Sequence, residues 1–230
     1  MTDAILGGGE TSAADAALLT RISAHRLLPV VVLEDAADAA GLGAALVAGG
    51  LPVAEVTFRT AAAADSVRAM VDAGLTEPDG PNLLVGAGTV VTPEQVDTAV
   101  AAGARFVVSP GLSRAVVERC QEHGVLVLPG TATATEVQAA LTMGLRTVKF
   151  FPAESSGGVA AIKALTGPFP QMRFVPTGGI KESNVADYLA VPAVLAAGGS
   201  WMVPGSAVAA GDFAQVERLT AGAVALVAGS

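Results

Sequence analysis

Residues 83–130 read LLVGAGTVVTPEQVDTAVAAGARFVVSPGLSRAVVERCQEHGVLVLPG, and two kinds of segment alternate within them. Short apolar runs are separated by longer segments that have the apolar spacing of helices. The first helical segment opens with Thr92-Pro93-Glu94-Gln95, a capping-box spacing with proline at the first helical position, and the second opens with Ser113. Gly103 and Gly124 stand where these helices should end, since glycine suits the left-handed C-terminal position. The stretch therefore predicts the order strand, helix, strand, helix, strand.

The same alternation extends in both directions along the chain. The expected strands are the apolar runs 28–33, 53–58, 83–85, 106–109, 125–128, 147–150, 173–176 and 194–197. Most of them contain no polar interruption, which is typical of parallel strands buried on both faces. Further helix signals are the N-cap candidates Asp35, Thr133, Ser183 and Asp212 and the C-terminal glycines Gly74 and Gly144.

Eight strand–helix units without a break in composition indicate an α/β chain that forms one closed (β/α)8 barrel, a TIM barrel. The alternative is an open doubly wound sheet, but Glu34-Asp35-Ala36-Ala37 follows the first run where that fold would carry a glycine-rich turn. We expect one domain over residues 1–230: an N-terminal segment and capping helix within 1–27, the helix beginning at Ser12, and the barrel over 28–230. The reactive groups should then lie on the loops that follow the strands.

The composition of the 230 residues excludes several classes of protein. They are 52% hydrophobic and 15% charged, with a net charge of −8 and no cluster of basic residues, so neither disorder nor nucleic-acid binding is expected. The uncharged stretch 188–211 is long enough to span a bilayer, but its prolines and glycines favour a buried strand followed by a loop. The start Met1-Thr2-Asp3 has no features of a secretory signal, so we expect a cytoplasmic protein without membrane contact.

Lys149 is the most informative single residue, because it lies inside the apolar run Thr147-Val148-Lys149-Phe150. Burial disfavours the charged ammonium and so favours a nucleophilic amine. The alternative is a structural lysine neutralised by a carboxylate. The chain has only two other lysines, Lys163 on an expected helix and Lys181 after a Gly-Gly turn, and both are weaker candidates.

Charged and polar residues end the second strand in Glu55-Val56-Thr57-Phe58-Arg59-Thr60. Alternation along a strand places Glu55, Thr57 and Arg59 on one side, which we expect to face the barrel interior. Glu55 could then act as a general acid and base, and Arg59 could bind a carboxylate. An internal ion pair that only positions the strand is the alternative, and a pair between Glu55 and Lys149 would fit both interpretations.

Two glycine turns follow the last two strands, Thr177-Gly178-Gly179-Ile180 and Gly198-Gly199-Ser200-Trp201. Barrels commonly bind phosphate between these two loops through backbone N–H groups, so the turns favour a phosphorylated substrate over simple turn glycines.

The remaining polar residues give weaker signals. Thr89, which follows the third strand, could bind a carboxylate or could equally be a turn threonine. Cys120, the only cysteine, is expected to be a small core residue rather than a nucleophile. No metal site is expected, because the two histidines, His25 and His123, fall on expected helices and no Cys/His cluster exists.

Six motifs in this order resemble the class I family of 2-keto-3-deoxy-6-phosphogluconate (KDPG) and 4-hydroxy-2-oxoglutarate (KHG) aldolases, over residues 29–212. They are EVTFRT at 55–60, VGAGTV at 85–90, VSPG at 108–111, VKFFPAE at 148–154, PTGGI at 176–180 and GGSW at 198–201. The resemblance implies a TIM barrel, a lyase that needs no cofactor, and usually a homotrimer.

The resemblance also implies a role for each matching residue. Lys149 would form a Schiff base with pyruvate and Glu55 would move protons. Arg59 and Thr89 would bind the pyruvate carboxylate beside Phe151, and Thr177 would orient the aldehyde. The residues implied for its phosphate are Gly178, Gly179, Gly199 and Ser200.

Two other functions compete with this interpretation. One is a sugar-phosphate epimerase or isomerase in which Lys149 acts only through its charge, and the other is a catalytically silent barrel that serves as an oligomeric scaffold. Within the family, KDPG, its galactonate-derived counterpart and KHG are all candidate substrates, and Thr177 favours KDPG.

Overall fold

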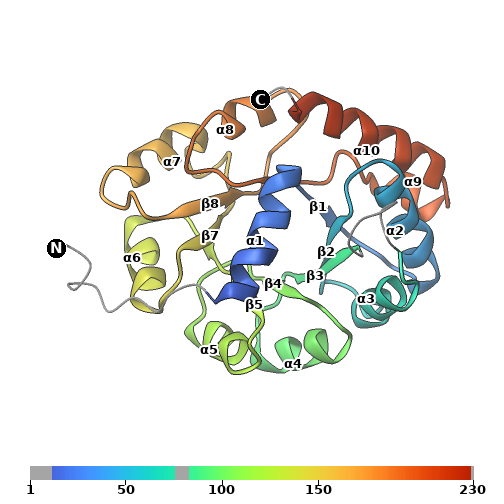
Figure 1. Cartoon of the computed structure of the whole chain (residues 1–230), viewed down its shortest axis with the longest axis horizontal. Coiled ribbons are helices and arrows are strands. Elements are labelled where there is room, and N and C mark those ends of the chain that lie inside the picture. The colour runs from blue at the N-terminus through green and yellow to red at the C-terminus, as the bar shows by residue number, and fades with distance from the viewer. Residues whose placement is uncertain (1–11, 76–82, 229–230) are drawn as a thin grey trace.

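The computed structural model describes residues 12–75 and 83–228. A ring of parallel strands lies at the centre and helices surround it (Figure 1). The strands are β1 (Leu27–Val31), β2 (Val53–Thr57), β3 (Leu84–Gly88), β4 (Phe106–Val108), β5 (Leu126–Leu128), β6 (Gly130–Thr131), β7 (Thr147–Phe150), β8 (Arg173–Pro176) and β9 (Ala197–Gly199).

Helices fill the connections between the strands, as the expected alternation requires. They are α1 (Ala13–His25), α2 (Ala39–Ala48), α3 (Ala63–Asp72), α4 (Pro93–Ala101), α5 (Arg114–Glu122), α6 (Ala134–Thr142), α7 (Gly158–Thr166), α8 (Val185–Leu189), α9 (Gly205–Ala209) and α10 (Phe213–Val227).

The ring consists of two groups of hydrogen-bonded strands that meet at both margins. One group has the order β5-β4-β3-β2-β1-β9 and the other β6-β7-β8, and every pair is parallel. At one margin only Pro129 separates β5 from β6, and its carbonyl still accepts from the Lys149 N–H at 3.0 Å. At the other margin, bridges join Phe174 to Val194 and Thr177 to Gly198. The prediction of a (β/α)8 barrel rather than an open sheet is confirmed.

Several expected strands differ at their ends from those in the structure: the run 28–33 is β1, which ends at Val31, and the run 83–85 overlaps the start of β3, which continues to Gly88. Two further differences have a clear structural cause. The expected run 125–128 corresponds to β5, and a second short strand, β6, follows after Pro129. Proline has no N–H to donate, so it interrupts the hydrogen-bonded ladder between the two strands. The last strand was expected at 194–197, whereas β9 is Ala197–Gly199 and Val194 contributes only a bridge. The pairing of β9 with β1 begins at Leu27, so the register of β1 sets the position of β9.

The stretch 188–211 contains more helix than was expected. After the end of α8 and strand β9 it forms α9 rather than loop alone. Within residues 12–75 and 83–228, no helix is long and apolar enough to cross a bilayer.

Most of the expected helix caps are present. Ser12, Thr92, Ser113 and Asp212 each accept a backbone N–H at the start of a helix. Thr133 and Glu136 form a complete capping box, and Asp35 caps a single 3₁₀ turn. The prediction for Ser183 is wrong: Asn184 precedes α8, and its side chain accepts the N–H of Lys181 instead of capping the helix.

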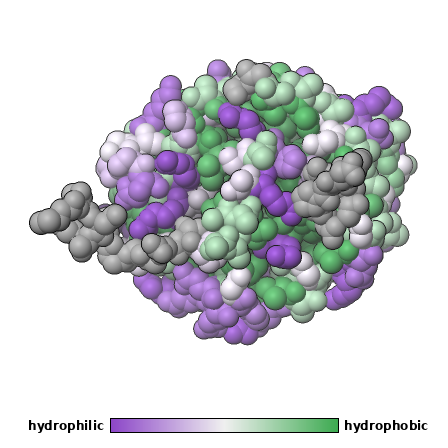
Figure 2. All heavy atoms as spheres, viewed as in Figure 1, coloured by the Kyte–Doolittle hydropathy of each residue, from purple (hydrophilic) through white to green (hydrophobic). Residues whose placement is uncertain are grey.

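Helix α1 lies across the near end of the barrel in the view of Figure 1, which supports its expected role as a cap. Its Ile22 is fully buried, and Leu18 and Leu19 pack on the core. Beneath it is a hollow of about 480 Å³, which extends from Asp15 to the starts of β5 and β7. Hydrophilic residues gather over the outer helices at the lower edge of this face (Figure 2). The carboxyl ends of the strands lie at the opposite, far end.

Candidate active site

Lys149 and Glu55 form the centre of the candidate site, inside the barrel. Lys149 lies on β7 and Glu55 on β2, and they are only 6% and 1% exposed. The Lys149 Nζ is 3.5 Å from the Glu55 Oε1. Strand alternation explains the arrangement, since the neighbours Val148 and Phe150 point outward to the helices when Lys149 points inward. The structure thus brings together the two residues that the sequence singled out separately.

One oxygen of the Glu55 carboxylate is available for further contacts. Its Oε2 is buried and has no hydrogen-bond partner among the described residues. A buried oxygen without a donor is costly, so it marks a place where a donor from a substrate would be favoured. Gly88 on the neighbouring strand β3 makes room for the carboxylate, because a Cβ at Gly88 would lie 2.3 Å from Glu55 Oε1.

The ring of Phe151 forms a wall beside the lysine. The Lys149 Nζ lies 5.0 Å from the centre of this half-buried ring, within the range of a cation–π interaction. An aromatic wall also limits the access of water to the amine.

Arg59 and Thr89 lie at the carboxyl ends of neighbouring strands. Arg59 is exposed just beyond β2, and its Nε donates to Thr57 Oγ1 at 3.3 Å rather than to the Lys149–Glu55 pair. Thr89 directly follows β3 and has a φ of 56°, in the left-handed region. This conformation is strained for a β-branched residue, and such strain clusters at functional sites.

The loop after β8 presents groups that suit an anion. Thr177 is buried, and its Oγ1 has no hydrogen-bond partner among the described residues. Gly178 and Gly179 have φ values of 99° and 81°, and their N–H groups donate to no acceptor within the described parts of the chain. Free N–H groups in a loop of this kind attract phosphate or carboxylate oxygens.

The loop after β9 lies directly beside the loop after β8. Gly198 packs against Thr177 so closely that a Cβ at Gly198 would lie 2.2 Å from Thr177 Oγ1. The indole of Trp201 lies on Gly199, and Ser200 between them is exposed. The two glycine turns are therefore neighbours in space, as the phosphate hypothesis requires.

Three residues near these loops were not singled out from the sequence. The Asn184 Nδ2 donates to the Gly179 carbonyl at 3.1 Å, and the Tyr188 hydroxyl donates to Glu154. Burial, together with the hydrogen bond to Glu154 and its charge, raises the pKa of Tyr188 above its ordinary value, so the phenol stays protonated. The only available signal was Glu154 at the end of the VKFFPAE motif, because partners on other elements cannot be read from spacing.

The described residues give two further indications of what the site can do. Residues 12–75 and 83–228 contain no group of three or more His, Cys, Asp and Glu side chains that could hold a metal ion. The 480 Å³ hollow beneath α1 lies where β5 and β7 begin, and neither Lys149 nor Glu55 lines it. The chemistry that the site offers is an amine, a carboxylate beside it, and loops with free N–H groups.

Fold and sequence comparisons define the class of protein: it is a barrel lyase of the aldolase type. The sequence profile of the "KDPG and KHG aldolase" family matches residues 19–219. A 2-dehydro-3-deoxy-phosphogluconate aldolase from Treponema pallidum is 52% identical over 85% of this chain and 90% of its own. The chain belongs to the KDPG and KHG aldolase family.

Solved structures agree with the family assignment. The KDPG aldolase of Legionella pneumophila, with pyruvate captured as a covalent carbinolamine, is 39% identical and has a TM-score of 0.83 over 92% of this chain and 98% of that one. The enzyme of Zymomonas mobilis, solved with 3-phosphoglycerate, is 40% identical and has a TM-score of 0.82 over 94% of this chain and 97% of that one.

Proposed function

We propose that this chain cleaves KDPG to pyruvate and glyceraldehyde 3-phosphate through a Schiff base on Lys149. The observation that carries the proposal is the buried contact between Lys149 Nζ and Glu55 Oε1, at 3.5 Å, in the interior of an aldolase-family barrel. A buried amine beside a carboxylate combines a nucleophile with the group that can move its protons.

The reaction begins when the Lys149 amine attacks the keto carbon of the substrate. Loss of water from the carbinolamine gives a cationic iminium, with Glu55 moving the protons. The C3–C4 bond then breaks: its electron pair flows into the iminium to form an enamine, and the C4 hydroxyl loses its proton as the aldehyde leaves. The enamine takes a proton at C3, and water hydrolyses the iminium to release pyruvate and regenerate Lys149. The iminium is the electron sink, so no metal or other cofactor is required.

Binding of the substrate is assigned to the groups around the pair. Arg59 and Thr89 would bind the carboxylate and Phe151 would pack on the pyruvate half. Thr177, whose buried Oγ1 has no hydrogen-bond partner in the described parts of the chain, would orient the aldehyde. The phosphate would bind to the two adjacent glycine turns through Gly178, Gly179, Gly199 and Ser200.

KHG is a second candidate substrate, because the matching family includes aldolases for both compounds.

We further propose that the chain is one domain over residues 1–230 and assembles as a homotrimer in the cytoplasm, in line with its resemblance to the family. Light scattering coupled to size exclusion tests the assembly, and a monomer would contradict it.

Reduction with borohydride in the presence of pyruvate tests the Schiff base. We expect one reduced pyruvate per chain on the peptide that contains Lys149, since only three lysines are present. An unmodified chain, or label on Lys163 or Lys181 alone, would refute the proposal.

Lys149→Arg separates nucleophilicity from charge. The guanidinium stays protonated and keeps the cation beside Glu55, so KDPG cleavage should be lost while the fold remains. Lys163→Arg, on the surface of α7, is the matched control and should retain cleavage. Substantial KDPG cleavage by Lys149→Arg would refute the Schiff base and favour a purely electrostatic role for Lys149.

A further inference from the structure

The segment that follows β7 runs directly beneath the proposed phosphate loop. The Ala153 N–H donates to the Thr177 carbonyl at 2.8 Å, and the Glu154 N–H donates to the Gly178 carbonyl at 3.0 Å. The segment that follows the strand of Lys149 and the loop proposed for phosphate are therefore joined by two backbone hydrogen bonds, immediately before the loop turns at Gly179.

The side chain of Glu154 continues this contact along the loop. A Cβ at Gly179 would lie 2.4 Å from the Glu154 Cγ and 2.7 Å from its Cβ, so the aliphatic stem of Glu154 packs directly on Gly179. The carboxylate extends past the glycine and accepts the hydroxyl proton of Tyr188. Because Tyr188 is 1% exposed and lies on α8, it has little freedom to move, and it fixes the position of Glu154.

A second contact holds the other side of the loop. The Asn184 side chain donates to the Gly179 carbonyl at 3.1 Å and accepts the Lys181 N–H at 2.8 Å. With Asn184 on one side and Glu154 on the other, the loop is held in a conformation that leaves the N–H groups of Gly178 and Gly179 without an acceptor within the described residues. Glycines with positive φ adopt many conformations in the absence of such contacts.

We propose that Tyr188 is a positioning residue for substrate phosphate: through Glu154 it holds loop 177–181 in the conformation that presents its N–H groups to the anion. This inference rests on the proposed aldolase function and adds to it a residue that does not itself touch the substrate. The arrangement also explains why an acidic residue lies so near a phosphate loop, since the carboxylate is engaged by the phenol and its stem faces Gly179.

Tyr188→Phe is the direct test, because it removes the hydroxyl and keeps the buried ring. We expect KM for KDPG and the inhibition constant of inorganic phosphate to rise about three- to tenfold, a change of the size that one ordinary hydrogen bond contributes, because Tyr188 acts on the anion only through Glu154 and the loop. The fall in kcat and in the rate of borohydride trapping with pyruvate alone should be smaller than the rise in KM, since the pyruvate half is assigned to Arg59, Thr89 and Phe151 rather than to this loop.

Ser66→Ala is the matched control. Ser66 on α3 is fully buried, and its hydroxyl has no partner among the described residues. This variant also loses one buried hydroxyl and should leave KM for KDPG unchanged. A Tyr188→Phe enzyme with the kinetic constants of Ser66→Ala would overturn the positioning role.

Two further variants keep the test open if Tyr188→Phe folds poorly. Glu154→Gln and Glu154→Ala both remove the charge, but only glutamine keeps an acceptor for the phenol and a stem on Gly179. We expect KM for KDPG to be at least about threefold higher in the alanine variant than in the glutamine variant. Equal KM values would overturn the inference.

The outcome for the wild-type enzyme distinguishes the two proposals. Failure of the proposed function would appear as absence of pyruvate trapping on Lys149 in the unmodified chain. Failure of the positioning role would appear as normal trapping and cleavage in the unmodified chain with no effect of Tyr188→Phe on KM or on phosphate inhibition.

Discussion

At the scale of single residues, the contact between Gly88 and Glu55 shows how tightly the carboxylate beside Lys149 is held. A methyl group on Gly88 would lie 2.3 Å from Glu55 Oε1, 2.6 Å from its Cγ and 2.8 Å from its Cδ. All three distances are shorter than van der Waals contact, and Glu55 is too deeply buried to move aside into solvent. The absence of a side chain at position 88 therefore determines where the carboxylate lies relative to Lys149.

We predict that Gly88→Ala lowers kcat for KDPG cleavage about 100-fold, because a displacement of about 1 Å at a reacting group has effects of this size. The overpacked barrel should also lose about 1–3 kcal/mol of unfolding free energy. Steady-state kinetics and urea unfolding measure the two effects.

Gly222→Ala is the control for the glycine substitution. A Cβ there meets no atom within 4 Å in the middle of α10, so we expect a gain of about 0.5–1 kcal/mol and normal activity. A fully active Gly88→Ala enzyme would show that the Glu55 carboxylate can work from another position.

Lys149 and Glu55 could be found from the sequence because each is a charged residue inside an apolar strand, and such residues need a special reason to be buried. Tyr188 could not be found in the same way. It lies on a short helix where an aromatic residue has an ordinary role in the core, and its significance depends on Glu154, 34 positions earlier in the chain. Residue type indicates chemistry, but a partner brought close by the fold has no local signature.

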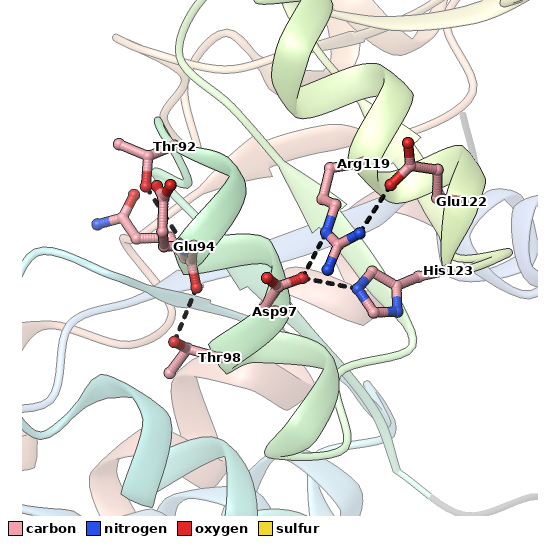
Figure 3. A network of polar contacts seen from close by, with 8 residues as sticks. Thr92, Glu94, Asp97, Thr98, Arg119, Glu122 and His123 are labelled. Atoms are coloured by element: carbon pink, nitrogen blue, oxygen red, sulfur yellow. Dashed lines mark hydrogen bonds and ion pairs between the residues drawn. The ribbon is translucent and has the colours of Figure 1, made fainter.

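At the scale of elements, side-chain contacts tie the outer helices α4 and α5 to one another. Asp97 on α4 accepts from Arg119 Nε at 2.6 Å and from His123 Nε2 at 2.7 Å, and Arg119 also donates to Glu122 at 2.7 Å (Figure 3). These hydrogen bonds, of which the one from Arg119 has the largest effect, hold the pKa of Asp97 below its ordinary value of 3.8. A lowered pKa means that the folded state binds the proton of Asp97 less readily than the unfolded chain does.

The stabilisation from Asp97 is therefore present above pH 3.8, the ordinary pKa, and is lost as the pH falls through the lower folded-state pKa. We predict that the Tm of Asp97→Asn lies below that of the wild type at pH 7, and that the difference shrinks on acidification below pH 3.8. Added salt should also reduce this difference in Tm, because the charged groups are exposed to solvent and are screened. Thermal unfolding followed by circular dichroism measures the effect.

Asp65→Asn is the comparison, because it removes an exposed ion pair with Arg68 that stays within α3. We expect a smaller change in Tm for Asp65→Asn than for Asp97→Asn, which removes contacts between two helices. Equal changes, or a difference for Asp97→Asn that does not depend on pH, would show that the contacts between α4 and α5 contribute nothing specific.

The elements themselves were predictable where local chemistry determines them. Thr92 and Thr133 cap helices as expected, because a cap depends on neighbours within three or four residues. The position of β9 was not predictable, since its register follows from pairing with β1 at Leu27, far away in sequence. The failure of Ser183 as a cap has a related reason: Asn184 precedes the five-residue α8, and its side chain bonds Gly179 and Lys181 of the loop after β8.

At the scale of the whole molecule, the net charge of −8 opposes the binding of an anionic substrate. Local groups must overcome this field, and the structure concentrates them at one end of the barrel: free N–H groups after β8 and Arg59 after β2. The 52% share of hydrophobic residues is explained by the same ring, because β2, β3, β4, β5 and β7 are buried along their full length.

Cys120 offers a measure of how cooperatively this closed ring opens. The thiol is fully buried on α5, and burial raises its pKa to about 12 from the ordinary 9.0. The thiolate is the reactive form, so both access and ionisation protect Cys120 in the folded protein. We predict that its reaction with a disulfide reagent at pH 8 is more than about a thousandfold slower in buffer than in denaturing urea.

The urea dependence of that slow reaction distinguishes two modes of opening. If the barrel opens as a unit, the labelling rate should rise with urea along the slope of global unfolding. An exposed thiol introduced by Ala101→Cys in a Cys120→Ala background should instead react at once at every urea concentration. The raised pKa of Cys120 gives a second test. Between pH 9 and 12 the thiol ionises in the unfolded chain but stays protonated in the folded protein. The free energy of unfolding of the wild type should therefore fall with rising pH relative to that of Cys120→Ala. Fast labelling in buffer, or labelling insensitive to urea, would mean that α5 detaches alone while the rest of the barrel stays closed.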